Sequence, residues 1–444
     1  MPDDGFVQFN KHIIEYMRGV YVLLLISLLG YAGRVSGQES VTITQCYEWA
    51  RANYPQIHQM GLIDQTERYS LSNVGKAWLP QLSVSGKASY QSDVTKLPLD
   101  GDKISSLLPG FEIPSLSKDQ YQVVAQVDQT IWDGGSTRSA RALTRAEAIA
   151  NREQLESELY ALNDRVNQIY FGCLLQDELI RQNALLQKEL QVNIERIEAM
   201  MENGVANQSD LESMEVELLN ARQNEIELKA SRTVYRQMLA TFINKPLTDQ
   251  VVLKTPESPE RSLSTQINRP ELRALDAKSE WIETQNKQVT AGLMPRIGAF
   301  VQGGYGRPGL NMLEDSFEPY YVAGVRLSWN LGKLYTLKND RRKIEVSRRQ
   351  IDVQWETFLF NTRLQLLQQN TEIKKMTDLM RADDDIIRLR TSIKQAAEVK
   401  LENGVISVTD LIREINAEDM ARQTAAAHRV QRLMTIYNYM YTTN

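Results

Sequence analysis

Few residues of this 444-residue chain have the types and spacing that catalysis requires. The histidines are His12, His58 and His428, and the cysteines are Cys46 and Cys173. No Cys/His spacing suits a metal or redox site, and no glycine-rich phosphate loop or catalytic carboxylate pair stands in a recognisable frame. We therefore expect no enzymatic activity and no cofactor. The cysteines are interpreted as small buried hydrophobic residues, with a disulfide as the alternative.

A duplicated stretch carries the remaining candidates. It reads ENGVANQSDL in residues 202–211 and ENGVISVTDL in residues 402–411. The Asn-Gly dipeptide tolerates positive φ, so each copy predicts the end of one helix and a reversal of the chain. Asn207 and Ser407 can then cap the returning helices, with Asp210 and Asp410 in the position of a capping-box acid.

The composition favours long helices, and the N-terminal segment indicates export from the cytoplasm. The chain has 42% hydrophobic residues, only 9 Phe and 13 Pro, and a net charge of −5, which does not indicate a nucleic-acid partner. Residues 1–37 carry a basic residue, a short apolar run and a small-residue cleavage site, so they are interpreted as a signal peptide, with an anchoring or buried first helix as the alternative. Beyond Gln38 no apolar run reaches about 18 residues, so a membrane crossing would require strands.

Four segments alternate with a period of two, as membrane strands do. They are LPQLSVSGKASY (79–90), VAQVDQTIW (124–132), MPRIGAFVQGGY (294–305) and YYVAGVRLSW (320–329). Aromatic residues stand near their ends, where a membrane interface would place them. Two soluble hairpins, each with one buried face, are the alternative. Because four strands cannot close a barrel and an open edge is excluded from lipid, membrane strands would require an oligomer.

The other segments predict helices of unusual length. Residues 136–203 and 333–402 contain no proline, and each would extend about 100 Å as one helix. Leucine, isoleucine and valine recur at heptad spacing in the first, interrupted by Gln176, Asn183 and Gln187, which are interpreted as polar layers that set the register. Helices over about 43–78 and 207–243 are half as long. The proline-rich linker 244–270 separates two predicted repeats, residues 38–243 and 271–444.

This order of elements resembles the TolC-like outer membrane factor family over the whole mature chain. The resemblance is carried by the two NGV…DL turns, the RPEL segment (269–272) and the strand pairs AWLPQLSVSG with QTIWDGG and LMPRIGAFVQ with LSWNLG. It implies a mixed α and β membrane protein of the outer membrane that extends into the periplasm. Three protomers would close a 12-stranded β-barrel, continued by a periplasmic α-helical barrel.

The resemblance also implies partners and a docking site. A periplasmic membrane fusion adaptor protein would dock on the helical tips, fed by an inner-membrane pump of the RND or ABC type. The adaptor-docking candidates are Asn203, Gly204, Val205, Asn403, Gly404 and Val405. The protein would then be the exit duct of a tripartite efflux or type I secretion system, passing drugs, metal ions or proteins. The alternative is an envelope coiled-coil scaffold or adhesin without a conduit.

Asp210 and Asp410 have a second interpretation in such a trimer. If both face the lumen, six carboxylates form a ring at the pore entrance that favours cations. The capping interpretation remains beside it, and one residue can serve both purposes.

Overall fold

The computed structural model describes residues 40–95, 116–258, 266–312 and 314–444. The predicted signal peptide, residues 1–37, lies outside these ranges. The chain divides into two compact units, each built from segments of both halves of the sequence. The tip unit comprises the described parts of residues 1–54, 162–262 and 371–438, and the sheet unit those of residues 55–161, 263–370 and 439–444.

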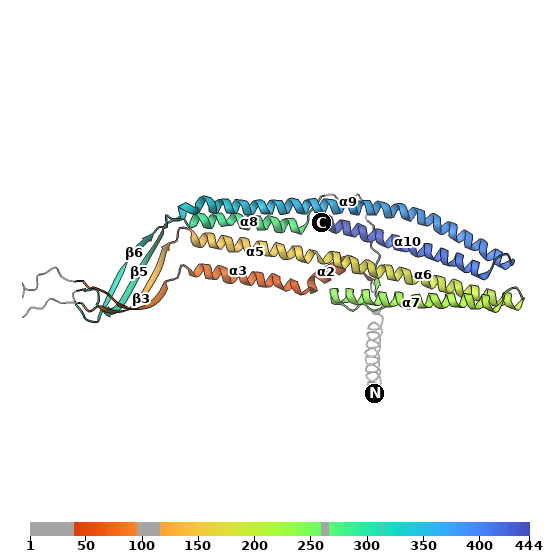
Figure 1. The fold of residues 1–444 in the computed structure, drawn as a ribbon, viewed down its shortest axis with the longest axis horizontal. Coiled ribbons are helices and arrows are strands. Elements are labelled where there is room, and N and C mark those ends of the chain that lie inside the picture. The colour runs from red at the N-terminus through yellow and green to blue at the C-terminus, as the bar shows by residue number, and fades with distance from the viewer. Residues whose placement is uncertain (1–39, 96–115, 259–265, 313) are drawn as a thin grey trace, which may run out of the picture. The chain divides into compact units, whose positions relative to one another are not determined.

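The tip unit is built from antiparallel helices (Figure 1). It contains α2 (Ile43–Asn53), α6 (Leu162–Glu202), α7 (Gln208–Ile243), the later part of α9 (Lys333–Glu402) and most of α10 (Val408–Thr443). α6 and α7 pack along their length as one hairpin, as predicted. A short parallel pair, β1 (Ser40–Val41) with β4 (Val252–Leu253), connects the linker to the residues just before α2.

The heptad positions of α6 form a buried seam. Val166, Ile169, Ile194 and Ile197 are all buried, whereas Ile180 is only half-buried. The predicted polar layer is confirmed for two of its three residues: Asn183 and Gln187 contact α7, whereas Gln176 Oε1 is buried without a hydrogen-bond partner among the described residues. The Nδ2 of Asn183 donates to the Ala221 carbonyl at 3.0 Å, and the Nε2 of Gln187 donates to Glu225 Oε2 at 2.9 Å. A buried amide needs such partners, so these contacts restrict how the helices can align.

A second core lies where α2 meets α6 and α7. It contains the two cysteines, which are free and buried, so the disulfide alternative is wrong. The linker joins this core, because Arg236 of α7 donates to the carbonyl oxygens of Thr248 at 2.7 Å and Val251 at 3.0 Å. The linker therefore packs beside the end of α7 as far as residues 248–253.

The sheet unit combines helices with a four-stranded antiparallel sheet. Its helices are α3 (Gln59–Lys76), α5 (Ser136–Tyr160), α8 (Pro270–Ala291) and the first part of α9. Its strands are β2 (Gln81–Tyr90), β3 (Asp119–Trp132), β5 (Arg296–Arg307) and β6 (Glu318–Ser328), in the order β2-β3-β5-β6. All four predicted strands are present, although β3 begins before the predicted Val124.

The register of the sheet aligns apolar residues across the strands. One row runs Leu82, Val127, Val301, Ala323, and the next runs Val84, Ala125, Gly303, Tyr321. These positions alternate with a polar face that includes Ser83, Gln126 and Gln302 in one row. A one-residue slip would exchange the two faces, so the register is what keeps the apolar face continuous.

Two predicted helices are interrupted. The first breaks after Asn53, because Tyr54 precedes Pro55 and is held in an extended conformation with ψ 128°. A short 3-10 turn, η1 (Pro55–His58), then leads into α3. The predicted 136–203 helix divides into α5 and α6 at Ala161, whose N–H bonds to the Ser157 and Leu159 carbonyls in a tightened turn. The second long helix is continuous as α9.

Candidate docking tips and membrane-facing sheet

The two tip turns have the same backbone geometry. Gly204 and Gly404 have φ of 71° and 68°, the left-handed region that glycine enters without a steric cost. The N–H of Gly204 donates to Met201 O and that of Val205 to Met200 O, both at 2.9 Å, which is the Schellman pattern. Gly404 and Val405 repeat it at 2.9 and 2.8 Å.

The asparagines of the Asn-Gly pairs do not supply the positive φ that the sequence predicts for these turns. Neither adopts positive φ. Instead the Nδ2 of Asn203 donates to Ala199 O at 2.8 Å, and that of Asn403 donates to Val399 O at 2.7 Å. Each amide thereby adds a side-chain donor to a carbonyl in the last turn of its helix, and Val399 O also accepts the backbone N–H of Asn403 at 3.2 Å. Only the glycine of each pair makes the reversal.

Both returning helices begin with the predicted capping boxes. The Asn207 side chain accepts from Asp210 N at 3.1 Å, while Asn207 N donates to Asp210 Oδ2 at 3.1 Å. In the second copy the backbone N–H and hydroxyl of Ser407 donate to Asp410 Oδ2 at 3.2 and 2.8 Å. These hydrogen bonds from the Ser407 side chain and backbone lower the pKa of the exposed Asp410 carboxyl. The capping interpretation is confirmed, and Asp210 and Asp410 remain partly exposed at the turns.

The turns expose apolar side chains beside their glycines. Val205 is 56% exposed and Val405 is 68% exposed. The next residues, Ala206 and Ile406, turn inward against a shared core. A β-carbon on Gly204 or Gly404 would have no neighbour within 4 Å, so each turn presents open space flanked by a valine.

The shared core brings the two hairpins together. Its buried members come from all four helices: Leu190, Ile194, Ile197, Met214, Leu218, Ala221, Ala397, Leu401, Val408, Leu411, Ile412 and Ile415. Because Ala206 and Ile406 pack into one core, the two turns that carry the six predicted docking residues belong to one helical bundle.

A buried ion network links the hairpins at the same level, and the sequence analysis missed it. Lys394 of α9 is paired with Glu189 of α6 and with Glu418 of α10. Burial raises the pKa of Glu418, but hydrogen bonds from Lys394, Thr391 and Arg422 outweigh burial and lower it to about 2. No local pattern could have shown this network, because Glu189 is distant in sequence from its partners.

The apolar face of the sheet is the other candidate surface. Leu82, Val84, Val301, Tyr321 and Val325 are between 55% and 80% exposed. Trp78, Trp132 and Trp329 are exposed at the strand ends nearest the helices, and the Trp329 indole donates to Leu293 O at 2.9 Å. An exposed, continuous apolar face bounded by tryptophans is suited to lipid.

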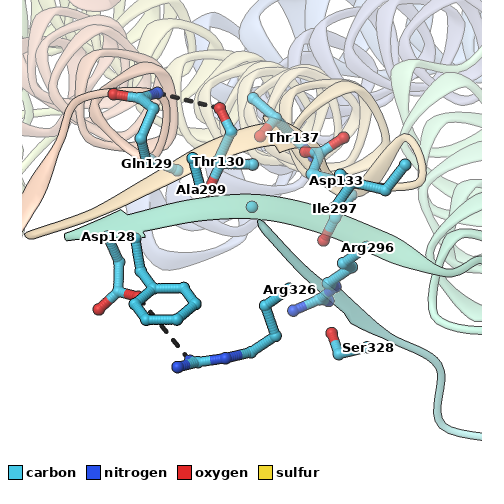
Figure 2. A pocket seen from close by; sticks show the side chains of 14 residues that line it. Asp128, Gln129, Thr130, Asp133, Thr137, Arg296, Ile297, Ala299, Arg326 and Ser328 are labelled. Carbon is cyan, nitrogen blue, oxygen red and sulfur yellow. Dashed lines mark hydrogen bonds and ion pairs between the residues drawn. The ribbon is translucent and has the colours of Figure 1, made fainter. Parts of the chain in front are cut away.

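The opposite face of the sheet is polar and hollowed near its base (Figure 2). A cavity of about 300 Å³ is lined by charged groups of β3, β5 and β6, including Asp128, Arg296 and Arg326. Arg326 lies 3.8 Å from Asp128 and stacks over the Phe300 ring at 4.8 Å. Asp133, at the edge of this cavity, accepts from Gly135 N at 2.9 Å and Thr137 N at 2.6 Å. Burial raises the pKa of Asp133, but the hydrogen bonds of Thr137 and Gly135 outweigh it and hold the pKa low.

Two absences hold for the described parts of the chain. They contain no group of three or more His, Cys, Asp or Glu side chains that could hold a metal ion. No helix among them is both long and apolar enough to cross a membrane.

The strand sheet with its lipid-compatible face and the helical hairpins with glycine tips agree with what the comparisons with known proteins show. Residues 46–245 match the model of the family described as outer membrane efflux protein. The resemblance to TolC-like outer membrane factors is thereby confirmed. The same match places the protein in the outer membrane, extending into the periplasm. No curated protein matches the chain.

Solved channels share the fold across most of the chain. CusC matches 90% of this chain and 92% of its own, with a TM-score of 0.64 and 14% identity. VceC from Vibrio cholerae matches 90% and 95%, with a TM-score of 0.61 and 12% identity. The Campylobacter jejuni CmeC outer membrane channel matches 90% and 85%, with a TM-score of 0.61 and 12% identity. The likeness at these identities is one of fold.

Proposed function

We propose that this protein is the exit duct of a tripartite efflux or type I secretion system, and that it conducts cargo passively rather than by enzymatic turnover. The observation that carries the proposal is the β2-β3-β5-β6 sheet, whose apolar face is exposed and whose outer strands, β2 and β6, lack partners among the described residues. Unpaired backbone groups are excluded from hydrocarbon, so β6 of one protomer must pair with β2 of the next. Three copies then close a 12-stranded barrel.

The helical tips supply the proposed docking site. A periplasmic adaptor protein would insert small or apolar side chains beside Gly204 and Gly404, where the open space and the exposed Val205 and Val405 favour close packing. Asn203 and Asn403 support these turns from within the helix ends. The adaptor would connect the duct to an inner-membrane pump.

A cross-linking experiment tests the duct. Cys46 and Cys173 are buried, so cysteines introduced on the edge strands would be the accessible ones. We expect Ser85→Cys on β2 combined with Tyr320→Cys on β6 to give covalent trimers with a thiol cross-linker in detergent, whereas each single variant should not exceed a dimer. Trimers should also conduct in planar bilayers. A monomer that remains soluble without detergent would refute the duct and leave the scaffold alternative.

A further inference from the structure

The helices next to the sheet carry an unusual concentration of positive charge. The segments 68–78, 136–146, 284–294 and 333–343 adjoin the strands and contain one acidic residue, Asp340. Their basic residues are all exposed: Arg68, Lys76, Arg138, Arg141, Arg145, Lys287, Lys333, Lys338, Arg341, Arg342 and Lys343. The whole chain has a net charge of −5, so this excess is local.

Three of these arginines line one groove. Arg138, Arg141 and Arg145 have the spacing i, i+3, i+7 and share one face of α5. With Trp78 and Thr137 they line a cavity of about 420 Å³. Arg141 reaches across to α3, because a β-carbon on Gly75 would lie 2.9 Å from its terminal nitrogen.

The groove has almost no internal counter-charge. None of the three arginines forms an ion pair with a residue that the structure describes. The one acidic lining residue, Asp133, accepts the N–H groups of Gly135 and Thr137 at the start of α5. Farther along α5 the situation reverses, since Arg152 is paired with Asp64 at 2.8 Å and with Glu67. The positive charge of the groove is therefore left to water or to an anion from outside this protomer.

The position of the groove indicates which kind of anion would bind there. Trp78 is 40% exposed at the junction of α3 and β2, and tryptophan indoles settle at the level of lipid headgroups. Arg138 to Arg145 extends about 10 Å along the helix, which is comparable to a headgroup layer of roughly 5–8 Å. Guanidinium groups bind phosphate through paired hydrogen bonds.

We propose that Arg138, Arg141, Arg145 and Trp78 form a binding site for the headgroup of an anionic phospholipid in the membrane leaflet that faces the helices. This inference depends on the proposed insertion of the sheet into the outer membrane. The site fixes the position of the protein along the membrane normal. The apolar face of the sheet lies in the hydrocarbon, and the arginines bind phosphate groups at the level of the adjacent headgroups.

Lipid retention in detergent tests the site. The purified full chain is titrated with phosphatidylglycerol or phosphatidylcholine, and bound lipids are counted by native mass spectrometry. We expect the wild type to prefer phosphatidylglycerol, and the triple variant R138Q/R141Q/R145Q to bind it about tenfold or more weakly. The matched control K188Q/K374Q/R429Q removes three exposed charges from the tip unit and should bind as the wild type does.

Two results would overturn the site: equal binding of both lipids by the wild type, or undiminished phosphatidylglycerol binding by the triple variant. Inorganic phosphate is the third arm. Displacement of the lipid by millimolar phosphate alone would mean that the groove binds free anions, against the proposal. Trimer formation and conductance are recorded on the same samples in neutral lipid, so failure of the duct is seen separately from failure of the lipid site.

Discussion

Glu418 Oε2 lies 2.6 Å from Lys394 Nζ, and both side chains are largely removed from water, with 3% and 12% of their surfaces exposed. This pair joins α10 to α9 while Glu189 adds α6, so the two hairpins are tied together by charge as well as by their common core. Breaking a buried ion pair leaves one charge desolvated, which costs more than the intact pair contributes.

Glu418→Gln should therefore destabilise the tip unit. We expect a loss of about 2–3 kcal/mol, since Lys394 retains Glu189, and an apparent melting temperature several degrees lower for the full chain in detergent. The control is Glu414→Gln, one turn earlier on α10. Glu414 pairs with the more exposed Arg390 and Arg413, so its loss should cost under about 1 kcal/mol. If the two variants lose the same stability, the buried Lys394–Glu418 pair contributes no more than the exposed pairs of Glu414.

The contribution of Asp419 to folding stability should depend on pH with the opposite sign to that of its neighbour Glu418. Burial, with Glu189 and Glu418 nearby, raises the pKa of Asp419 from 3.8 to about 6, although Gln423 donates to it at 2.6 Å and Arg422 opposes the shift. The folded state thus holds this proton more tightly than the unfolded state, and stability falls as the pH rises from about 4 to about 6.

Asp419→Asn should remove that loss. At about pH 8 we expect the variant to be more stable than the wild type by about 1 kcal/mol, after allowance for partial exposure, and at about pH 4 the two should converge. Thermal unfolding at both pH values measures the difference. An equal stability difference between variant and wild type at the two pH values would mean that packing, and not protonation of Asp419, causes the effect. Glu418 has the opposite effect, because its pKa is lowered to about 2 in the folded state. Its contribution to the stability of the tip unit is lost only as the pH falls below about 4.5.

These carboxylates show where sequence reasoning ends. Period-two alternation was enough to predict all four strands, because a lipid-compatible face imposes it residue by residue. The capping boxes were predictable since Asn207 and Asp210 are local partners. The Lys394 network was not, because its members come from three helices and meet only after folding. The break at Pro55 carried a readable signal, whereas the one at Ala161 has neither proline nor glycine to announce it.

The tip glycines should be sensitive to any β-carbon, because of their backbone conformation. We expect Gly404→Ala and Gly204→Ala each to cost about 1 kcal/mol. The control is Gly61→Ala in α3, where φ is not positive and no atom lies within 4 Å of the new carbon; it should stabilise by about 0.5–1 kcal/mol. Gly404→Asn, which tolerates positive φ, separates folding from docking. If the variant is stable and still captures the adaptor as the wild type does, Gly404 is not a docking residue.

The two thiols should be almost inert in the folded protein. Burial raises the pKa of both Cys46 and Cys173 to about 12, so their thiolate fractions at pH 8 are about a thousandfold below that of an ordinary cysteine. A maleimide-type reagent should label Val405→Cys at once and leave the native cysteines unmodified until denaturant is added. Rapid labelling of the native chain would mean that the core around α2 opens readily.

Asp410 can be divided into its capping role and its proposed charge at the pore entrance. Asp410→Asn keeps an oxygen that can accept from Ser407, so the turn should persist while the proposed trimer loses three charges. If the ring exists, bilayer conductance should lose much of its cation preference, and the double variant with Asp210→Asn should lose more.

Ser407→Ala is the matched control, since it removes the hydroxyl that donates to Asp410 at 2.8 Å but keeps the carboxylate. It should destabilise the helix start by about 1 kcal/mol without changing selectivity. Unchanged selectivity in the double variant would place both aspartates away from the ion path and leave them as caps alone.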